Sequence, residues 1–165
     1  MFHRVFLGTA IIVFAILSGV LFKFFTLDVR PDVVSKFDYV NQKRQIKCLA
    51  DNIYYEAGNQ SLEGMKAVAF VTINRMNSNV WPADACEVVY QKTGSTCQFS
   101  WVCEHTKAPN NVMWDKAYNI ARHVWYKYDT LKDPTHGAMY YHAVYVKPGW
   151  KLSKTVQIDD HIFYK

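Results

Sequence analysis

One glutamate in the sequence stands in surroundings that suit acid catalysis. Glu56 lies in the stretch N-I-Y-Y-E-A-G, where two tyrosines precede it and small residues follow it. Partial burial among apolar and aromatic side chains raises the pKa of a carboxyl group, because burial disfavours the charged form. Such an acid, protonated near neutral pH, can protonate the leaving oxygen of a glycosidic bond. A solvent-facing glutamate on a helix is the alternative that the residue alone leaves open.

Other catalytic patterns are missing from the sequence. It contains no G-x-S-x-G motif, no Walker loop and no H-E-x-x-H zinc motif. Cys97, Cys103 and His105 form C-x5-C-x-H, which is not a standard spacing for zinc ligands. A metal pair formed by His136 and His142 is conceivable, but exposed or structural histidines explain these residues more simply. We therefore expect no cofactor and no metal site.

The helix that carries Glu56 is readable from its apolar spacing. Apolar or aromatic residues recur at helical intervals on one side of the segment from about Gln42 to Ala57, at Ile46, Leu49, Ala50, Ile53, Tyr54 and Ala57. At 100° per residue, Glu56 falls at the edge of this apolar stripe. Gly58 and Asn59 are typical residues for the end of a helix.

The other elements predict a mainly helical α+β domain. A second helix, apolar nearly all round and therefore central, is expected from Leu62 to about Met76 with Ser61 as its N-cap. A short helix is expected at 84–90 with Asp84 as its cap, and a long one at 112–128 capped by Asn110 or Asn111. Aromatic and β-branched residues at 138–146 and at the end of the chain indicate a small antiparallel sheet or hairpin.

The N-terminal segment predicts a membrane anchor. Val5–Phe22 is a stretch of 18 residues without a charge, and that length can span the hydrocarbon core of a bilayer. A cleaved signal peptide is the alternative, but the apolar run is long and no clear A-x-A site follows. We expect residues 1–25 to be a transmembrane anchor, 26–43 a polar connector interrupted by Pro31, and 44–165 the folded domain. The short N-terminal tail would stay in the cytoplasm, which places the domain outside.

Composition and cysteine content fit an exported domain. The chain of 165 residues is 50% hydrophobic and 16% aromatic, with a net charge of +5, so it can form a core and favours anionic partners. Its positive charges are scattered, which argues against nucleic-acid binding. Four cysteines permit disulfides, and we expect one bridge within Cys86–Cys103, with the pairing left open.

Five sequence blocks together resemble a known family. They are C-L-A-D-N-I-Y-Y-E-A, E-G-M-K-A-V-A-F-V-T-I-N-R-M, W-P-A-D-A-C-E-V-V-Y-Q, C-Q-F-S-W, and the pair Y-Y-H-A and D-D-H-I-F-Y. In this order, from about Cys48 to Tyr164, they resemble the cell wall hydrolases of the spore-cortex-lytic (SleB/CwlJ) type. The resemblance implies a fold like that of lysozymes and lytic transglycosylases, with peptidoglycan as substrate and cleavage at the MurNAc–GlcNAc bond. It also makes Glu56 the catalytic acid.

The resemblance further implies which residues contact the glycan. The expected substrate-binding residues are Tyr55, Gln98, Phe99, Ser100, Trp101, Tyr140, Tyr141 and His142. For each aromatic residue, filling of the core is an equally good explanation. Asn74 and Arg75 are expected to secure a helix end or to pair with an acid.

One departure from the family pattern concerns a second carboxylate. Many members have a glutamate where this chain has Gln60. Glu63 is the remaining nearby acid, and we expect it to be either a helix-start residue or a residue that supports the acid, rather than a nucleophile. Because hydrolases normally use two carboxylates, a single acid favours lytic transglycosylation over muramidase hydrolysis.

Several functional alternatives stay open at the level of sequence. The chain could be an inactive, membrane-anchored module that binds peptidoglycan, or an N-acetylmuramoyl-L-alanine amidase, although no convincing set of zinc ligands is present. An active enzyme held at the inner membrane, with its catalytic domain in the periplasm, could be a bacterial wall enzyme or a phage endolysin. The expected partners are peptidoglycan and the membrane.

Overall fold

The computed structural model describes residues 31–104 and 110–165, with the side chains of Lys36 and of the residues from Asp38 onward in these ranges. The chain divides into two compact units, Met1–Tyr39 and Val40–Lys165, and the second unit holds the folded domain considered below. The predicted anchor at Val5–Phe22 lies outside the described residues. Within the described ranges, no helix combines the length and apolar character that crossing a bilayer requires.

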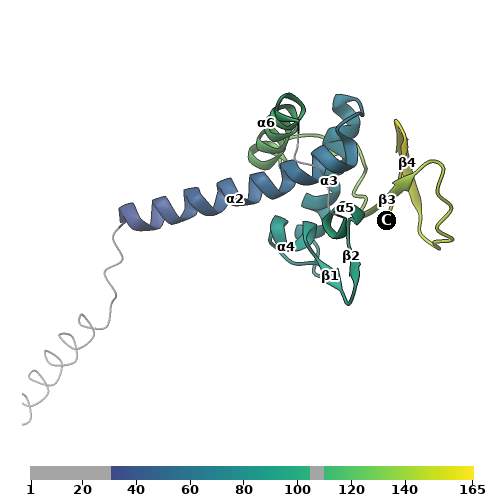
Figure 1. Ribbon diagram of the computed structural model, residues 1–165, viewed down its shortest axis with the longest axis horizontal. Coiled ribbons are helices and arrows are strands. Elements are labelled where there is room, and N and C mark those ends of the chain that lie inside the picture. The colour runs from purple at the N-terminus through teal and green to yellow at the C-terminus, as the bar shows by residue number, and fades with distance from the viewer. Residues whose placement is uncertain (1–30, 105–109) are drawn as a thin grey trace, which may run out of the picture. The chain divides into compact units, whose positions relative to one another are not determined.

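The helix that carries Glu56 begins earlier than its apolar stripe indicates. Helix α2 runs from Pro31 to Ala57 (Figure 1), whereas the sequence predicts its start near Gln42, after a polar connector interrupted by Pro31. Proline is well tolerated in the first turn of a helix, where its missing N–H would have no partner, so Pro31 begins this helix. The described side chains before Gln45 are exposed, and such a segment has no buried face for an apolar pattern to reveal.

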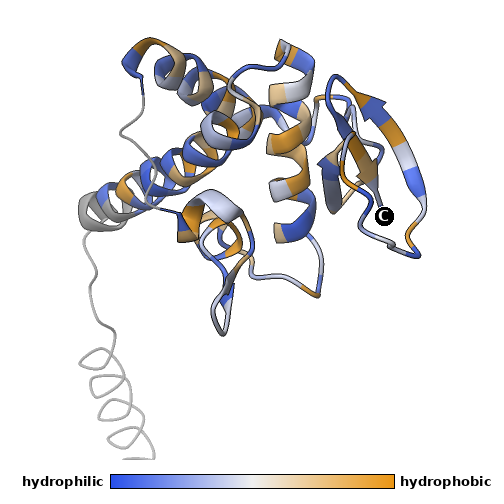
Figure 2. Ribbon diagram, turned by 45° about the vertical axis from the view of Figure 1, so that its right-hand side comes forward, coloured by the Kyte–Doolittle hydropathy of each residue, from blue (hydrophilic) through white to orange (hydrophobic). Residues whose placement is uncertain are grey.

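The main core lies where α2 meets two further helices, α3 (Leu62–Met76) and α6 (Asn111–Lys127). From α2 it receives Ile46, Leu49, Ala50, Ile53 and Ala57, which are the predicted stripe, with Tyr54 packed at its edge. Helix α3 contacts α6, the short helix α4 (Ala85–Val89) and the sheet. It is therefore the central helix, as its apolar circumference predicts, and Figure 2 shows hydrophobic residues along much of its length.

The predicted helix caps are confirmed. Ser61 accepts a hydrogen bond from the backbone N–H of Gly64 at the start of α3, and Asp84 accepts one from Glu87 at the start of α4. Asn110 rather than Asn111 caps α6. These side chains satisfy N–H groups that the first turn of a helix leaves without partners.

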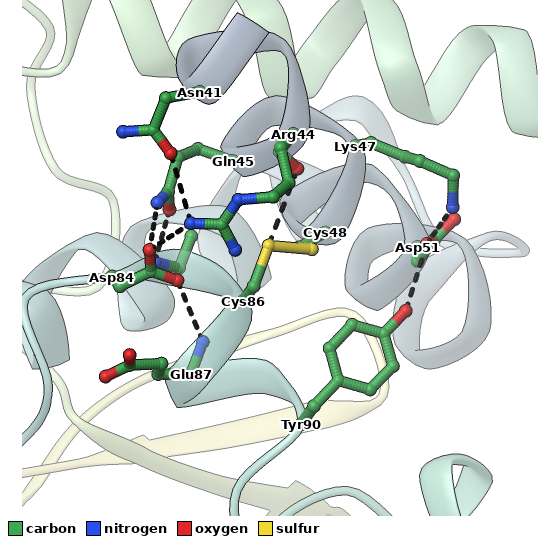
Figure 3. Close-up of a disulfide and its surroundings, with 11 residues drawn as sticks. Asn41, Arg44, Gln45, Lys47, Cys48, Asp51, Asp84, Cys86, Glu87 and Tyr90 are labelled. Carbon is green, nitrogen blue, oxygen red and sulfur yellow. Dashed lines mark hydrogen bonds and ion pairs between the residues drawn. A yellow bond between two sulfur atoms is a disulfide. The ribbon is translucent and has the colours of Figure 1, made fainter. Parts of the chain in front are cut away.

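Two disulfides fix the pairing that the sequence leaves open. Cys48 of α2 bonds to Cys86 of α4, and Cys97 bonds to Cys103. The second bridge lies within the predicted cysteine-rich stretch. Figure 3 shows the first one, beside the cap residue Asp84, which also binds the side chain of Arg44.

The strands form two small antiparallel sheets. Strands β1 (Lys92–Thr93) and β2 (Thr96–Cys97) pair in a hairpin, for which the sequence analysis predicts no element. The larger sheet contains β3 (Tyr140–Ala143), β4 (Lys154–Ile158) and β5 (His161–Tyr164) in the order β3-β5-β4. The predicted β region is confirmed, and β4 is a further strand between the two predicted segments. The domain is mainly helical with small antiparallel sheets.

A short helix, α5 (Ser100–Cys103), follows the β1–β2 hairpin. It lies inside the loop closed by the Cys97–Cys103 disulfide. Together the hairpin, the disulfide and α5 hold the segment 98–101 that the sequence analysis assigns to the substrate.

Candidate active site

Glu56 occupies the last turn of α2, and the way the helix ends fixes its position. The backbone N–H of Gly58 donates to the carbonyl oxygen of Tyr54 at 3.1 Å. A Cβ atom at residue 58 would lie only 2.5 Å from that oxygen, so glycine alone fits there without movement of the backbone. The chain can therefore turn immediately after Ala57 and leave Glu56 at the edge of the core, as the helical spacing predicts.

Tyr141 contacts Glu56 from the opposite element. Its hydroxyl donates to Oε2 of Glu56 at 3.1 Å. The Tyr141 ring packs against all three hydrophobic clusters of the domain, and its strand pairs Tyr141 with the fully buried Phe163. Because the ring is held on several sides, the hydroxyl is a fixed partner for the Glu56 carboxyl.

The surroundings of Glu56 raise its pKa above the ordinary value of a glutamate. Burial is the largest cause, since it disfavours the ionised form. The hydrogen bond from Tyr141 and the positive charge of Arg75 oppose this effect, and the negative charge of Glu104 adds to it. The net result is a carboxyl group that keeps its proton to higher pH, which is what a general acid requires.

Glu56 opens into a pocket of about 240 Å³, here called the Glu56 pocket. It is lined by Glu56, Arg75, Gln98, Phe99, Ser100, Tyr140, Tyr141 and Trp150. Five of the predicted substrate-binding residues thus line one cavity with the predicted acid, although they come from separate parts of the chain. The pocket combines aromatic walls with an amide, a hydroxyl and a guanidinium, a mixture typical of sites that bind polar ligands with apolar faces.

Two of the predicted substrate-binding aromatics lie elsewhere. Trp101 is only 9% exposed, stacks on Tyr55 with a centroid distance of 4.5 Å and donates from its indole N–H to Asn52. Its ring therefore fills the core and has no face left for a sugar, and Tyr55 packs with it. The sequence cannot distinguish these roles, because a buried ring and a substrate-stacking ring have the same residue type.

His142 and Glu63 are not among the residues that line the Glu56 pocket, although the His142 ring packs edge-on against Trp150, which does line it. The His142 ring stacks on Tyr164 and makes a 2.9 Å hydrogen bond with its hydroxyl. Glu63 is exposed in the first turn of α3 and lines a different pocket of about 480 Å³ with Leu62, Lys66, Lys132, Pro134, His136 and Val156. Of the two roles expected for Glu63, the helix-start position is therefore the one observed, and its side chain is not among those that line the Glu56 pocket.

Gln60 also points away from the acid. Its side-chain amide donates to Oδ2 of Asp160 at 3.1 Å, and its carbonyl oxygen accepts from the Asp160 backbone N–H at 3.2 Å. The residue therefore ties the end of α2 to the β4–β5 turn. A glutamate at position 60 would face Asp160 rather than the Glu56 pocket, so the identity of this residue says little about a second catalytic carboxylate.

Two pocket residues were not assigned to the substrate from the sequence. Arg75 was expected to secure a helix end or to pair with an acid. Its Nε donates to the Met139 carbonyl at 2.7 Å, which ties the last turn of α3 to the segment before β3, and its charge lowers the pKa of Glu56. Trp150 has no predicted role in the sequence, although it lines the pocket. A large aromatic residue directly after Pro-Gly, in an irregular segment, was the signal that could have found it.

The alternative zinc site formed by Cys97, Cys103 and His105 is excluded, because two of these three residues cannot bind a metal ion. Cys97 and Cys103 are bonded to each other and are not thiolates that could bind a metal. His105 lies outside the described residues. Elsewhere in the described ranges, no group of three or more histidine, cysteine, aspartate or glutamate side chains could hold a metal ion.

The fold and the pocket define a mainly helical, disulfide-bonded domain with one half-buried acid in an aromatic-lined cavity. The sequence profile of the family described as Cell Wall Hydrolase matches residues 59–164, and the chain belongs to this family. The matched range begins three residues after Glu56, so the family match itself does not include that residue. Comparison with curated proteins gives no match.

Two solved structures have a similar fold. The catalytic domain of the SleB protein of Bacillus cereus is 23% identical, with a TM-score of 0.52, and the match covers 73% of this chain and 89% of that one. The catalytic domain of the germination-specific lytic transglycosylase SleB from Bacillus anthracis is 27% identical, with a TM-score of 0.53 and coverage of 73% and 93%. These matches agree with the resemblance noted in the sequence.

Proposed function

We propose that this protein cleaves the glycan strands of peptidoglycan at the MurNAc–GlcNAc bond, with Glu56 as the catalytic acid. The observation that carries the proposal is the raised pKa of a carboxyl group that lies in a cavity lined by residues able to bind a sugar. Membership of the cell wall hydrolase family supports peptidoglycan as the substrate. The lytic transglycosylase named among the similar structures supports the type of reaction.

The mechanism needs one group that changes its protonation state. Protonated Glu56 would donate its proton to the glycosidic oxygen as the bond to the anomeric carbon breaks. The resulting carboxylate would then take the proton of the muramoyl 6-hydroxyl while that oxygen attacks the anomeric carbon. Both products are accounted for without water, and Glu56 ends the cycle protonated again. The Tyr141 hydroxyl and the charge of Arg75 would stabilise the carboxylate in the intermediate stage.

The composition of the pocket favours this single-acid route. Among the described residues that line the Glu56 pocket, Glu56 is the only carboxyl group. Hydrolysis with retention or inversion of configuration normally uses a second carboxylate within about 5–10 Å. Glu104 acts on the pKa of Glu56 only as the last of four causes, and its side chain is exposed. Lytic transglycosylation is therefore preferred to hydrolysis.

A cleavage assay tests the role of Glu56. Zymography on purified peptidoglycan with wild type and Glu56→Gln should show clearing by wild type only. Clearing by both proteins would place the acid elsewhere. Clearing by neither would favour a module that binds peptidoglycan without cleaving it. Release of stem peptides instead of glycan fragments would favour an amidase.

Product analysis tests the type of reaction. Mass spectrometry of the digest should find 1,6-anhydromuramic acid at the new ends, and reducing sugars there would mean hydrolysis. Gln60→Glu should give the same products as wild type, because residue 60 faces Asp160. A switch to reducing ends in that variant would mean that the residue takes part in the chemistry after all.

The setting of the reaction is part of the same proposal. The uncharged segment Val5–Phe22 would anchor the domain to the outer face of the inner membrane, next to its substrate. Fractionation of cells that express the full chain should recover it with the membranes, and removal of residues 1–25 should release it. Recovery of the full chain in the soluble fraction would contradict the anchor.

A further inference from the structure

Arg75 is an unusual member of the Glu56 pocket. It lies in the last turn of α3 and is only 2% exposed, yet it lines the cavity. Its Nε is held by the Met139 carbonyl. The guanidinium carbon lies 4.4 Å from the centre of the Trp81 ring, and Phe99 and Tyr140 are also within cation–π distance.

One donor of this buried guanidinium has no acceptor. Nη1 of Arg75 is buried and makes no hydrogen bond among the described residues. A buried N–H group without a partner destabilises the folded state, and native proteins contain few of them. The group cannot lose its proton to relieve the cost, because arginine stays charged. A fixed, unsatisfied donor beside a catalytic acid indicates that a ligand supplies the missing acceptor.

The surroundings select the kind of acceptor. Two of the flanking rings, those of Phe99 and Tyr140, line the pocket together with Trp150 and offer apolar walls on which a methyl group can pack. An anionic group would lie close to the Glu56 carboxylate whenever that carboxylate is ionised, and the two would repel each other. A neutral amide carbonyl avoids this repulsion and is a strong acceptor. A small, planar group that joins a carbonyl oxygen to a methyl group is an acetamido group.

We propose that Arg75 recognises the N-acetyl group of the bound glycan: Nη1 donates to the acetamido carbonyl oxygen, and the aromatic rings contact the methyl group. The protein would then act on N-acetylated strands and discriminate against strands from which the acetyl groups have been removed. This inference rests on the proposed function, because it assumes that a peptidoglycan strand occupies the Glu56 pocket. It adds the residue that makes the site selective for one chemical state of the strand.

The other contacts of Arg75 make this recognition effective. The hydrogen bond from Nε and the three rings fix the guanidinium plane before any ligand binds. A donor that is already held in place loses little conformational freedom when it binds its acceptor. Lysine at this position would keep the positive charge but lose the planar donor pair and the bond to Met139.

The test compares two substrates and three proteins. The substrates are peptidoglycan glycan strands freed of stem peptides, before and after chemical de-N-acetylation. The proteins are the full-length wild type, Arg75→Lys, and Asn74→Ala as a matched control. Asn74 donates to the carbonyl oxygen of Ala138, next to Met139, and to Asp133, so its loss loosens the same segment without removing a group from the pocket.

The readout is the ratio of the cleavage rates on the two substrates. Wild type should prefer the acetylated strand by roughly 10- to 100-fold, the range expected for one hydrogen bond from a charged donor. Arg75→Lys should lower that ratio by about tenfold, mainly by losing rate on the acetylated strand, and Asn74→Ala should keep the wild-type ratio. An equal ratio in wild type and Arg75→Lys would overturn the proposal, as would an equal loss in both variants. Because lysine keeps the charge, repulsion of the cationic amine in the treated strand does not explain a change.

Two further measurements separate this proposal from the proposed function. Binding of both strands can be followed by tryptophan fluorescence, because Trp150 lines the pocket and Trp81 packs on Arg75. It reports the acetyl preference even if no strand is cleaved. If wild type binds with that preference and Arg75→Lys loses it, the recognition role stands although the enzymatic function fails.

The second measurement uses only the wild-type protein and changes the substrate instead. Glycan strands are first de-N-acetylated and then N-thioacetylated. The resulting thioacetamido groups carry a sulfur atom, a weaker hydrogen-bond acceptor, in place of the carbonyl oxygen. Wild type should cleave or bind them several-fold less well than the acetylated strands, and equal performance on both would refute the proposal.

Discussion

Replacement of Tyr141 by phenylalanine isolates the hydrogen bond that this side chain makes to the candidate acid. Phenylalanine keeps the ring that packs against the three hydrophobic clusters and removes only the hydroxyl that lies 3.1 Å from Oε2 of Glu56. That hydroxyl stabilises the ionised carboxylate and lowers the pKa of Glu56 against the larger effect of burial. Tyr141→Phe should therefore raise the pKa of Glu56 further.

The size of the effect follows from the two protonation states. A hydrogen bond to a charged acceptor contributes about 1.5–3 kcal/mol, and one to a neutral acceptor about 0.5–1.5 kcal/mol. The difference favours the ionised form of Glu56 by about 1–1.5 kcal/mol, or roughly 5- to 10-fold. Without the hydroxyl, the protonated form should persist to a correspondingly higher pH. The rate at the optimum should fall, because the carboxylate formed during the reaction loses a donor.

The assay is the pH dependence of kcat/KM on solubilised glycan strands, with Tyr140→Phe as the control. Tyr140 lines the same pocket, and no hydrogen bond joins its hydroxyl to Glu56 among the described contacts. The alkaline limb, where the acid loses its proton, should move to higher pH in Tyr141→Phe and stay in place in Tyr140→Phe. An alkaline limb that stays in place or moves to lower pH in Tyr141→Phe would refute the assignment of that limb to Glu56.

Two further predictions concern stability. The raised pKa of Glu56 means that folding favours its protonated form. The stability of the fold therefore falls as the pH rises from the ordinary glutamate pKa through the raised pKa of the folded state. Glu56→Gln should raise Tm at pH 7 relative to wild type, and this gain should vanish in acid. The Cys48–Cys86 disulfide joins residues 38 apart in the sequence and should contribute about 4 kcal/mol to the free energy of unfolding measured in urea. The Cys97–Cys103 disulfide joins residues only 6 apart and should contribute about 2 kcal/mol. Because the smaller loop holds pocket residues 98–100, paired serine substitutions at Cys97 and Cys103 should nevertheless reduce cleavage more than those at the other bridge.

These stability predictions can each fail in a specific way. An unchanged or lower Tm of Glu56→Gln at pH 7, compared with wild type, would mean that burial of the carboxyl group has no net cost. If the pair of serines at Cys48 and Cys86 lowers cleavage more than it lowers stability, the larger bridge would be the one that supports the pocket.

The parts of the fold that repeat a local pattern could be predicted from the sequence. The stripe of α2, the boundaries of α3 and the caps Ser61 and Asp84 follow from interactions between residues within one or two turns. The start of α2 at Pro31 could not be predicted, because an exposed helix has no apolar face. The β1–β2 hairpin and α5 are too short to show any period.

Some residues of the candidate site could also be predicted from the sequence, and the roles of others could not. Helical spacing placed Glu56 at the edge of the core, and the resemblance to wall hydrolases added Gln98, Phe99, Ser100, Tyr140 and Tyr141, which line its pocket. The roles of Trp101, His142, Glu63 and Gln60 depended on which side chains meet across the fold. Each of them has a partner far away in the sequence or lies on another face, which residue type does not reveal.

The sequence by itself therefore determined the helical core, the position of one glutamate at its edge and the family to which the chain belongs. Only the tertiary structure decided that the Tyr141 hydroxyl binds this glutamate and that Arg75, with an unsatisfied donor, lines the same cavity. It also decided that the Gln60 side chain binds Asp160 and does not face that cavity. The physical reason is that helical periodicity depends on neighbours a few residues apart. Burial, a shifted pKa and an unpaired donor depend on contacts between α2, α3 and β3, which only folding brings together.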